Sequence, residues 1–157
     1  MARIHQDIEV SVPLWEAYEQ WSRVELLPGF LRHLSSAVPL EDELVRFTTE
    51  IGGRSRQFIA RVQDRRPDRM IRWSCAEDPT HHGEITFDEL GHGRTQVDLT
   101  VVWEPARMSE TSGSLFRLDE ISVLEDLQEF KRSVEASHRN RRPLSRLIPG
   151  RSKTSTR

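Results

Sequence analysis

The chain of 157 residues is long enough for one domain with a buried core, without support from metal ions or disulfide bonds. Hydrophobic residues make up 36% and charged residues 31%, and Cys75 is the only cysteine, so an internal disulfide is excluded. No stretch reaches the roughly 18 apolar residues of a membrane span, and the N-terminus lacks the apolar core of a signal peptide. We therefore expect a cytoplasmic protein.

Charge is distributed unevenly along the chain. Residues 138–157 contain seven basic residues and no acidic one, which leaves 16 of the 23 basic residues to face all 25 acidic ones. The body is therefore acidic, which argues against nucleic-acid binding by the folded domain.

The first segment alternates apolar and polar residues, with Ile4 and Val10 on one side, and predicts a β-strand. Pro13 then stands where a helix can begin, because the first turn does not need its missing N–H. Apolar residues follow at helical spacing, and Pro28-Gly29 is expected to divide this stretch into two short helices.

Residues 34–105 alternate in the same way between short turn sequences. Gly52-Gly53 and Gly91-His92-Gly93 are typical of tight turns between strands. Short turns join antiparallel neighbours, so these segments and the first strand predict an antiparallel sheet of about seven strands with one buried face.

The last predicted element is an amphipathic helix. Its start is open, because Ser109, Thr111 and Ser114 can each cap a helix. It is expected to end near Ser137, so that residues 1–137 form the domain and residues 138–157 a disordered basic tail. An alternative for the tail is weak electrostatic contact with an anionic membrane or with nucleic acid. The apolar stripe of the helix consists of Phe116, Val123, Leu127, Phe130 and Val134.

Several local sequences resemble those of a known family. Ser11–Tyr18, Leu27–Phe30, His82–Phe87 and Gly93–Val97 resemble segments of the polyketide cyclase/dehydrase group and its coenzyme Q-binding relatives in the START-like (SRPBCC) superfamily. The similarity extends over roughly residues 3–136. It implies an α+β helix-grip fold, in which a curved antiparallel sheet wraps around a long C-terminal helix and two short helices follow the first strand.

The resemblance also implies a ligand pocket between the concave sheet face and the long helix. Members of the group are similar to aromatase/cyclases that fold poly-β-ketone chains, or to carriers of lipids and quinones. The expected partner of this chain is therefore a hydrophobic small molecule.

Motifs of several other enzyme classes are absent from the sequence. Gly91-His92-Gly93 lacks the third glycine and the following helix of a phosphate-binding loop. There is no His-Glu-x-x-His or paired-cysteine spacing for a metal ion, and no serine nucleophile elbow. We therefore expect no metal ion and no other cofactor.

The pair His81-His82 is the candidate for acid–base chemistry. Successive strand residues face opposite sides, and the alternation places His81 inward. A neutral imidazole there can transfer protons in an aldol-type cyclisation or a dehydration. The alternative is that both histidines are solvated at the end of a loop.

The inward positions are largely aromatic, which suits a planar apolar ligand but equally suits a filled core. Cys75 also fits the role of a small buried hydrophobe, and Thr49 offers a hydroxyl group. The candidate ligand-binding residues are Phe47, Thr49, Phe58, Trp73, Cys75, Ile85, Phe87, Val101, Trp103 and Leu127.

Three hypotheses for the function follow. The first is binding of a polyketide-like or aromatic molecule, with cyclase or dehydratase activity as its enzymatic form. The second is a non-catalytic carrier or chaperone for a quinone or lipid. The third is an interaction module whose cavity is filled by side chains. Catalysis requires a titratable group at an open cavity, a carrier requires an apolar cavity, and the third hypothesis requires neither.

Overall fold

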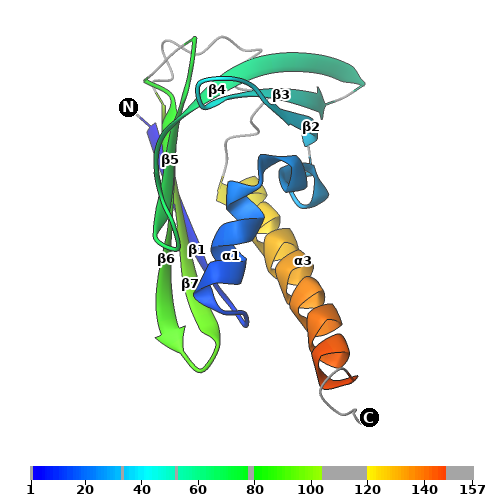
Figure 1. The fold of residues 1–157 in the computed structure, drawn as a ribbon. Helices are drawn as coiled ribbons and strands as arrows, with labels where there is room; N and C mark the ends of the chain where they lie inside the picture. Colours follow the sequence, from blue (N-terminus) through cyan, green and yellow to red (C-terminus); the bar gives the residue numbers. More distant parts are fainter. Residues whose placement is uncertain (1, 33, 52, 78–79, 104–119, 148–157) are drawn as a thin grey trace.

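The computed structural model describes residues 2–32, 34–51, 53–77, 80–103 and 120–147. It contains an antiparallel sheet of seven strands in the order β1-β7-β6-β5-β4-β3-β2, which curves around the helices on its concave side (Figure 1). The strands are β1 (Ala2–Val10), β2 (Leu34–Pro39), β3 (Leu44–Ile51), β4 (Arg54–Arg66), β5 (Met70–Cys75), β6 (His82–Gly91) and β7 (Arg94–Trp103). The helices are α1 (Leu14–Ser22), the 3-10 helix η1 (Val24–Gly29) and α3 (Glu120–Leu147). The α+β helix-grip fold expected from the sequence is thus confirmed.

The alternation of β7 determines which face of the sheet is buried. Its inward residues Thr95, Val97, Leu99 and Val101 are all buried, and β7 pairs with β1 from Ala2 opposite Trp103 to Val10 opposite Thr95. The Thr95 hydroxyl donates a hydrogen bond of 2.8 Å to the carbonyl of Val12. This bond fixes the corner at which the chain leaves β1 for α1.

The longest strand, β4, carries the curvature of the sheet. Its register with β5 shifts between Val62 and Asp64. Such a bulge bends a strand and increases its twist. Figure 1 shows β4 curving over the helices, so the sheet continues around them instead of leaving them uncovered.

The two short helices are divided at a different residue from the one expected. The break lies at Arg23, which has extended backbone angles (φ −87°, ψ 92°), and Pro28 lies inside η1. Tertiary packing accounts for this position, because Trp21 and Phe30, on either side of the break, both pack against Phe130 of α3, with ring centroids 5.4 and 5.3 Å away.

The long helix α3 buries the predicted apolar stripe as far as the structure describes it. Val123, Leu127, Phe130 and Val134 are 0 to 8% exposed, whereas Phe116 and the three candidate caps lie outside the described residues. The prediction of an end near Ser137 is wrong, because α3 continues to Leu147. A helix that projects beyond its sheet needs no apolar face to maintain its backbone hydrogen bonds, so apolar periodicity underestimated its length. Among the described residues, no helix is both long and apolar enough to cross a membrane.

Polar contacts attach α3 to the corner between β1 and α1. The Glu135 carboxylate accepts hydrogen bonds from the Ser11 backbone N–H (2.7 Å) and from Lys131 Nζ (2.9 Å). Burial raises the pKa of Glu135, but these two hydrogen bonds and the positive charges of Lys131 and Arg139 together outweigh it, so the pKa lies below its ordinary value. His138 Nδ1, further along the helix, lies 2.7 Å from Oε1 of the buried Glu16 on α1.

Candidate functional site

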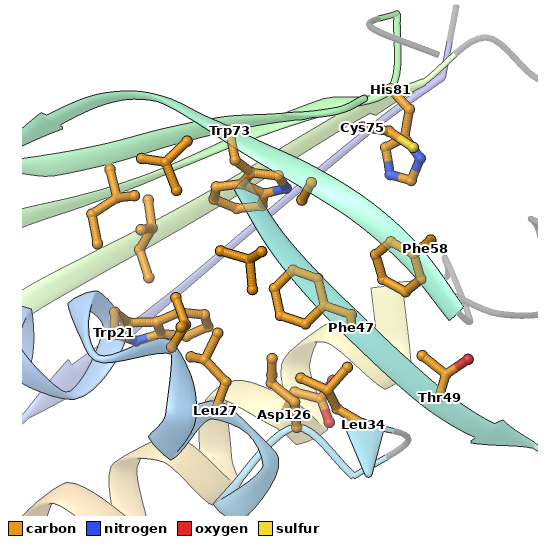
Figure 2. Close-up of a pocket in the computed structure, with 17 residues that line it drawn as sticks. Trp21, Leu27, Leu34, Phe47, Thr49, Phe58, Trp73, Cys75, His81 and Asp126 are labelled. Atoms are coloured by element: carbon orange, nitrogen blue, oxygen red, sulfur yellow. The ribbon is translucent and has the colours of Figure 1, made fainter. Parts of the chain in front are cut away.

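A partly enclosed cavity of about 210 Å³ lies between the sheet and the helices (Figure 2). Strands β3, β4, β5 and β6 form one wall, and α1, η1 and α3 contribute the other. Most of its lining is aliphatic or aromatic, so it favours an apolar molecule. The 17 lining residues are Trp21, Val24, Leu27, Leu31, Leu34, Val45, Phe47, Thr49, Phe58, Ala60, Val62, Ile71, Trp73, Cys75, His81, Ile85 and Asp126.

Seven of the candidate residues line this cavity. They come from β3, β4, β5, β6 and the loop before β6, as the alternation of those strands predicts. They are Phe47, Thr49, Phe58, Trp73, Cys75, His81 and Ile85.

Three further candidates are buried in the core and do not line the cavity. Phe87 packs edge-on against Tyr18 of α1, with ring centroids 5.7 Å apart, and Val101 and Leu127 belong to the same core. Alternation places Phe87 and Val101 on the same inward face as the strand residues that line the cavity. Phe87 does not reach the cavity because α1 covers the sheet at that position. The side chain of Trp103, at the end of β7, lies outside what the structure describes.

Sequence reasoning named only Leu127 on the helices and missed the helix residues that do line the cavity. Trp21, Val24, Leu27 and Leu31 line the cavity from α1, η1 and the residues after it. Their apolar spacing was visible in the sequence, but it did not show whether they faced a cavity or packed solidly. Asp126 of α3 was also missed, because an acidic residue next to an apolar stripe is ordinarily solvated.

The strand wall of the cavity is rich in aromatic rings. Phe47 and Phe58 are directly opposite each other on β3 and β4, and their rings stack with centroids 5.2 Å apart and planes 26° apart. Both side chains, like Trp73, are half-buried, and all three line the cavity. Part of each side chain thus remains available for contact.

Asp126 is the one carboxyl group among the lining residues that the structure describes. Its side chain is 26% exposed, and Oδ1 lies 3.9 Å from Nε of Arg32. Burial raises the pKa of Asp126 to about 6, although the Arg32 backbone N–H donates to the carboxylate and the Arg32 guanidinium attracts it, both of which lower the pKa. The group can therefore exchange a proton close to neutral pH.

His81 lies at another part of the wall, beside Cys75 (Figure 2). It precedes β6 instead of beginning it, and it is 5% exposed, whereas the next residue, His82, is half-buried and does not line the cavity. The carbonyl of His81 accepts a hydrogen bond of 2.9 Å from the Cys75 backbone N–H. The alternative of a solvated His81 is therefore wrong, because only 5% of the residue is exposed.

Two other lining residues carry buried polar atoms. Trp21 Nε1 and Thr49 Oγ1 have no hydrogen-bond partner among the described residues. Both atoms are covered by protein, so a ligand would reach them only after a side-chain rotation. The Asp126 side chain, at 26% exposed, is more accessible to a ligand.

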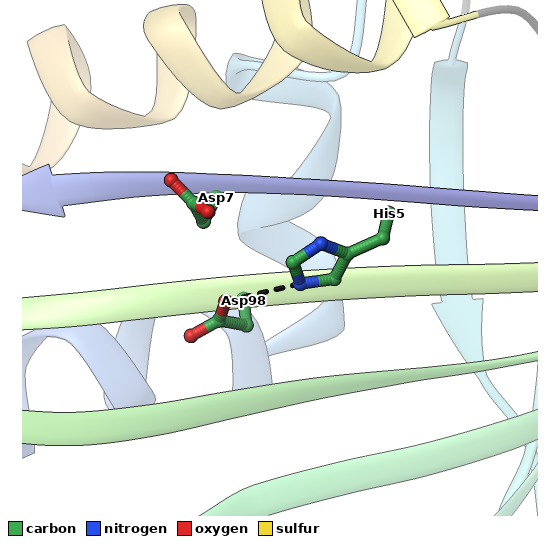
Figure 3. Close-up of side chains that lie close together, drawn as sticks. All are labelled: His5, Asp7 and Asp98. Carbon is green, nitrogen blue, oxygen red and sulfur yellow. Dashed lines mark hydrogen bonds and ion pairs between the residues drawn. The ribbon is translucent and has the colours of Figure 1, made fainter.

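A separate polar cluster lies on the outer face of the sheet (Figure 3). One ligand-type atom each of His5, Asp7 and Asp98 lies within 4.8 Å of the others. His5 Nε2 and Asp98 Oδ1 are 3.0 Å apart and form a hydrogen bond. Exposed groups of this kind are common without a metal ion, and the hydrogen bond accounts for the arrangement.

Solved structures share this architecture. The Zhui aromatase/cyclase from Streptomyces sp. R1128 superimposes with a TM-score of 0.69 at 19% identity, over 85% of this chain and 93% of that one. A START superfamily protein from Mycobacterium smegmatis superimposes with a TM-score of 0.67 at 18% identity, over 85% of this chain and 97% of that one. At these identities the likeness shows the fold alone.

Sequence comparison defines the family. An uncharacterised 17.2 kDa protein of Streptomyces lincolnensis is 27% identical over 136 residues, which cover 86% of this chain and 91% of that protein. Residues 10–132 match the family described as polyketide cyclase/dehydrase and lipid transport. Since the match spans most of the chain, this protein belongs to the polyketide cyclase/dehydrase and lipid transport family.

Proposed function

We propose that this protein binds a hydrophobic, aromatic or polyketide-like small molecule in the cavity between the sheet and α3. The observation that carries the proposal is the cavity of about 210 Å³ with its apolar and aromatic lining. Burying apolar surface there contributes about 25 cal/mol per Å², which favours an apolar ligand over a polar one. The third hypothesis, a cavity filled by side chains, is not supported, because this volume is not filled.

The enzymatic form of the proposal is a cyclase or dehydratase. Above pH 6 or so the Asp126 carboxylate would accept a proton from the carbon beside a ligand carbonyl. The resulting carbanion would attack a second carbonyl carbon, and the oxygen of that carbonyl would take a proton from a donor such as His81. In a dehydration, the base would take a carbon-bound proton, and the hydroxyl group on the next carbon would take a proton from the same donor and leave as water. The positions of Asp126 and His81 on different parts of the wall suit two such roles (Figure 2).

The second candidate is a non-catalytic carrier of a quinone or lipid. It is favoured by the small number of titratable groups in the lining, which is otherwise almost wholly apolar. The family description names lipid transport as well as cyclase/dehydrase members. A carrier would use Asp126 only to orient the ligand, so substitution of Asp126 would change affinity without abolishing any turnover.

Native mass spectrometry of protein purified from its own host tests the proposal. We expect a small molecule to co-purify, and a polyketide or quinone panel to raise the melting temperature. An empty protein together with no rise across the panel would overturn both small-molecule functions. Turnover of a bound polyketide would support the enzymatic form, and binding without turnover would support the carrier.

A further inference from the structure

One wall of the cavity depends on a residue that has no side chain. Trp73 on β5 and Gly83 on β6 are direct cross-strand partners. A Cβ atom placed on Gly83 would lie 2.2 Å from Cζ2 of Trp73, and 2.7 and 2.8 Å from Cε2 and Cη2. These distances are far inside van der Waals contact, so the Trp73 ring occupies the space in which any other side chain at position 83 would stand.

This arrangement leaves the cavity open. Side chains on a strand ordinarily stand away from the sheet. Gly83 has no side chain, so the space beside it is free for the Trp73 ring. The Trp73 indole therefore lies close against the strands (Figure 2) and forms part of the cavity wall. A larger residue at position 83 would lift the indole toward the cavity.

The neighbouring lining extends the aromatic surface. Val62, the partner of Trp73 on β4, lines the cavity, and beyond it on β4 and β3 lie the stacked rings of Phe58 and Phe47. The wall contributed by η1 is aliphatic, with Leu27 among its residues. Aromatic rings prefer offset-stacked or edge-on partners, so a surface of this kind favours a ligand that is itself an aromatic ring system.

The volume limits the size of that ligand. An apolar cavity of about 150 Å³ holds benzene, and this cavity is about 210 Å³. The difference is enough for a second fused ring inside the cavity. The Asp126 carboxylate adds an acceptor for a hydroxyl group on the ligand.

We propose that Gly83 and Trp73 determine specificity, and that together they adapt the cavity to a planar aromatic ligand of two fused rings that carries a hydroxyl group. The inference rests on the proposed binding function and adds the shape and chemistry of the ligand to it. Trp73 contacts the ligand, and Gly83 acts through the position of Trp73.

The test uses 2-naphthol and its saturated counterpart decahydro-2-naphthol, which share a hydroxyl group and a carbon skeleton but differ in planarity and aromaticity. Titration calorimetry on the full chain should show about tenfold tighter binding of 2-naphthol, the size expected for an aromatic contact. Equal binding of the two compounds would overturn the proposed selectivity for aromatic rings.

Two variants and a control assign the selectivity to residues. Gly83→Ala should weaken 2-naphthol binding by about tenfold or more, whereas Gly29→Ala, whose added Cβ meets no atom within 4 Å, should leave it within about twofold. Trp73→Leu should remove most of the preference for 2-naphthol over its saturated counterpart. The double variant Gly83→Ala/Trp73→Leu should match Trp73→Leu, because the clash is then relieved.

The outcomes separate this inference from the proposed function. If Gly83→Ala does not fold, the affinities of Trp73→Leu and of the double variant for 2-naphthol still test whether Gly83 acts through Trp73. Equal affinities would support this role, and different affinities would exclude it. Unchanged 2-naphthol affinity in folded Gly83→Ala would also overturn the inference. Binding of long-chain lipids but of neither two-ring compound would refute the inference and leave the proposed function standing.

Discussion

The Asp126 carboxyl on α3 lies beside Arg32, with Oδ1 3.9 Å from the guanidinium Nε and a hydrogen bond from the Arg32 backbone N–H. These contacts do not offset burial, which raises the pKa of Asp126 from 3.8 to about 6. The protein thus keeps an acid in the cavity wall at a cost in stability, which is typical of groups retained for function.

Asp126→Asn should therefore stabilise the protein above pH 6. Between the ordinary pKa of 3.8 and about 6, the native state binds more protons than the unfolded chain, so this group lowers wild-type stability as the pH rises through that window. The gain from the substitution should reach at most about 3 kcal/mol at pH 8. Urea unfolding between pH 4 and 8 measures it, and a gain that persists unchanged at pH 4 would contradict the assignment to Asp126.

The same carboxyl should control turnover if the protein is a cyclase or dehydratase. The rate with a polyketide substrate should rise with pH through about 6, as the base loses its proton. Asp126→Asn should lower kcat by about a hundredfold or more, and His81→Ala should lower it if His81 is the proton donor. Glu125→Gln, at the exposed neighbour that also pairs with Arg32, is the control and should have little effect. Full activity in Asp126→Asn would assign the base elsewhere.

Glu135 should contribute to stability by attaching α3 to the sheet. Glu135→Gln loses the charge that accepts hydrogen bonds from Ser11 and Lys131 and should cost about 1–3 kcal/mol near pH 7. Because the pKa of Glu135 is lowered in the native state, this contribution is present above its ordinary value and is lost as the pH falls through the native one. Glu129→Gln, which removes an exposed pair with Arg132, should cost at most about 0.5 kcal/mol in the same unfolding assay. Equal losses in the two variants would show that Glu135 is only a surface charge.

The turn between β2 and β3 is strained at Glu43. Asp42 and Glu43 both have positive φ angles, 59° and 61°, a conformation in which a side chain is disfavoured. Glu43→Gly should stabilise the protein by about 1 kcal/mol, and the lost pairing with Arg65 at 3.7 Å should matter little. Glu41→Gly, in the same turn at a residue without a positive φ, should give no gain. Thermal unfolding distinguishes the two, and a loss of stability in Glu43→Gly would refute the strain.

Two aspartates oppose each other on the outer face of the sheet. Asp7 on β1 is the direct partner of Asp98 on β7. Like charges in this position are unfavourable, so Asp7→Asn should stabilise the protein by about 0.2–1 kcal/mol at low salt. The gain should shrink in 1 M salt because of screening. Asp88→Asn, opposite Gln96, is the control, and an equal gain there would attribute the effect to overall charge.

The pattern of the chain was sufficient to predict the fold and seven of the 17 residues that line the cavity. Alternation in the strands identified the inward face, and the local sequences identified the family, because both depend on neighbours within a few residues. The same alternation could not separate Phe58 from Phe87. Both face inward, but α1 covers the region of Phe87, and Phe58 remains at the cavity.

The sequence by itself determined the order of the strands and helices, the buried faces of the strands and the family, but not where each helix breaks or ends. Only the tertiary structure decided which inward residues meet a cavity, that Trp73 lies over Gly83, and that Asp126 lies in a wall with a pKa near 6. Periodicity is a local property, and it shows on which face of an element a residue lies. Cavity volume and proton affinity depend on which distant element covers that face, and the folded chain alone supplies that element.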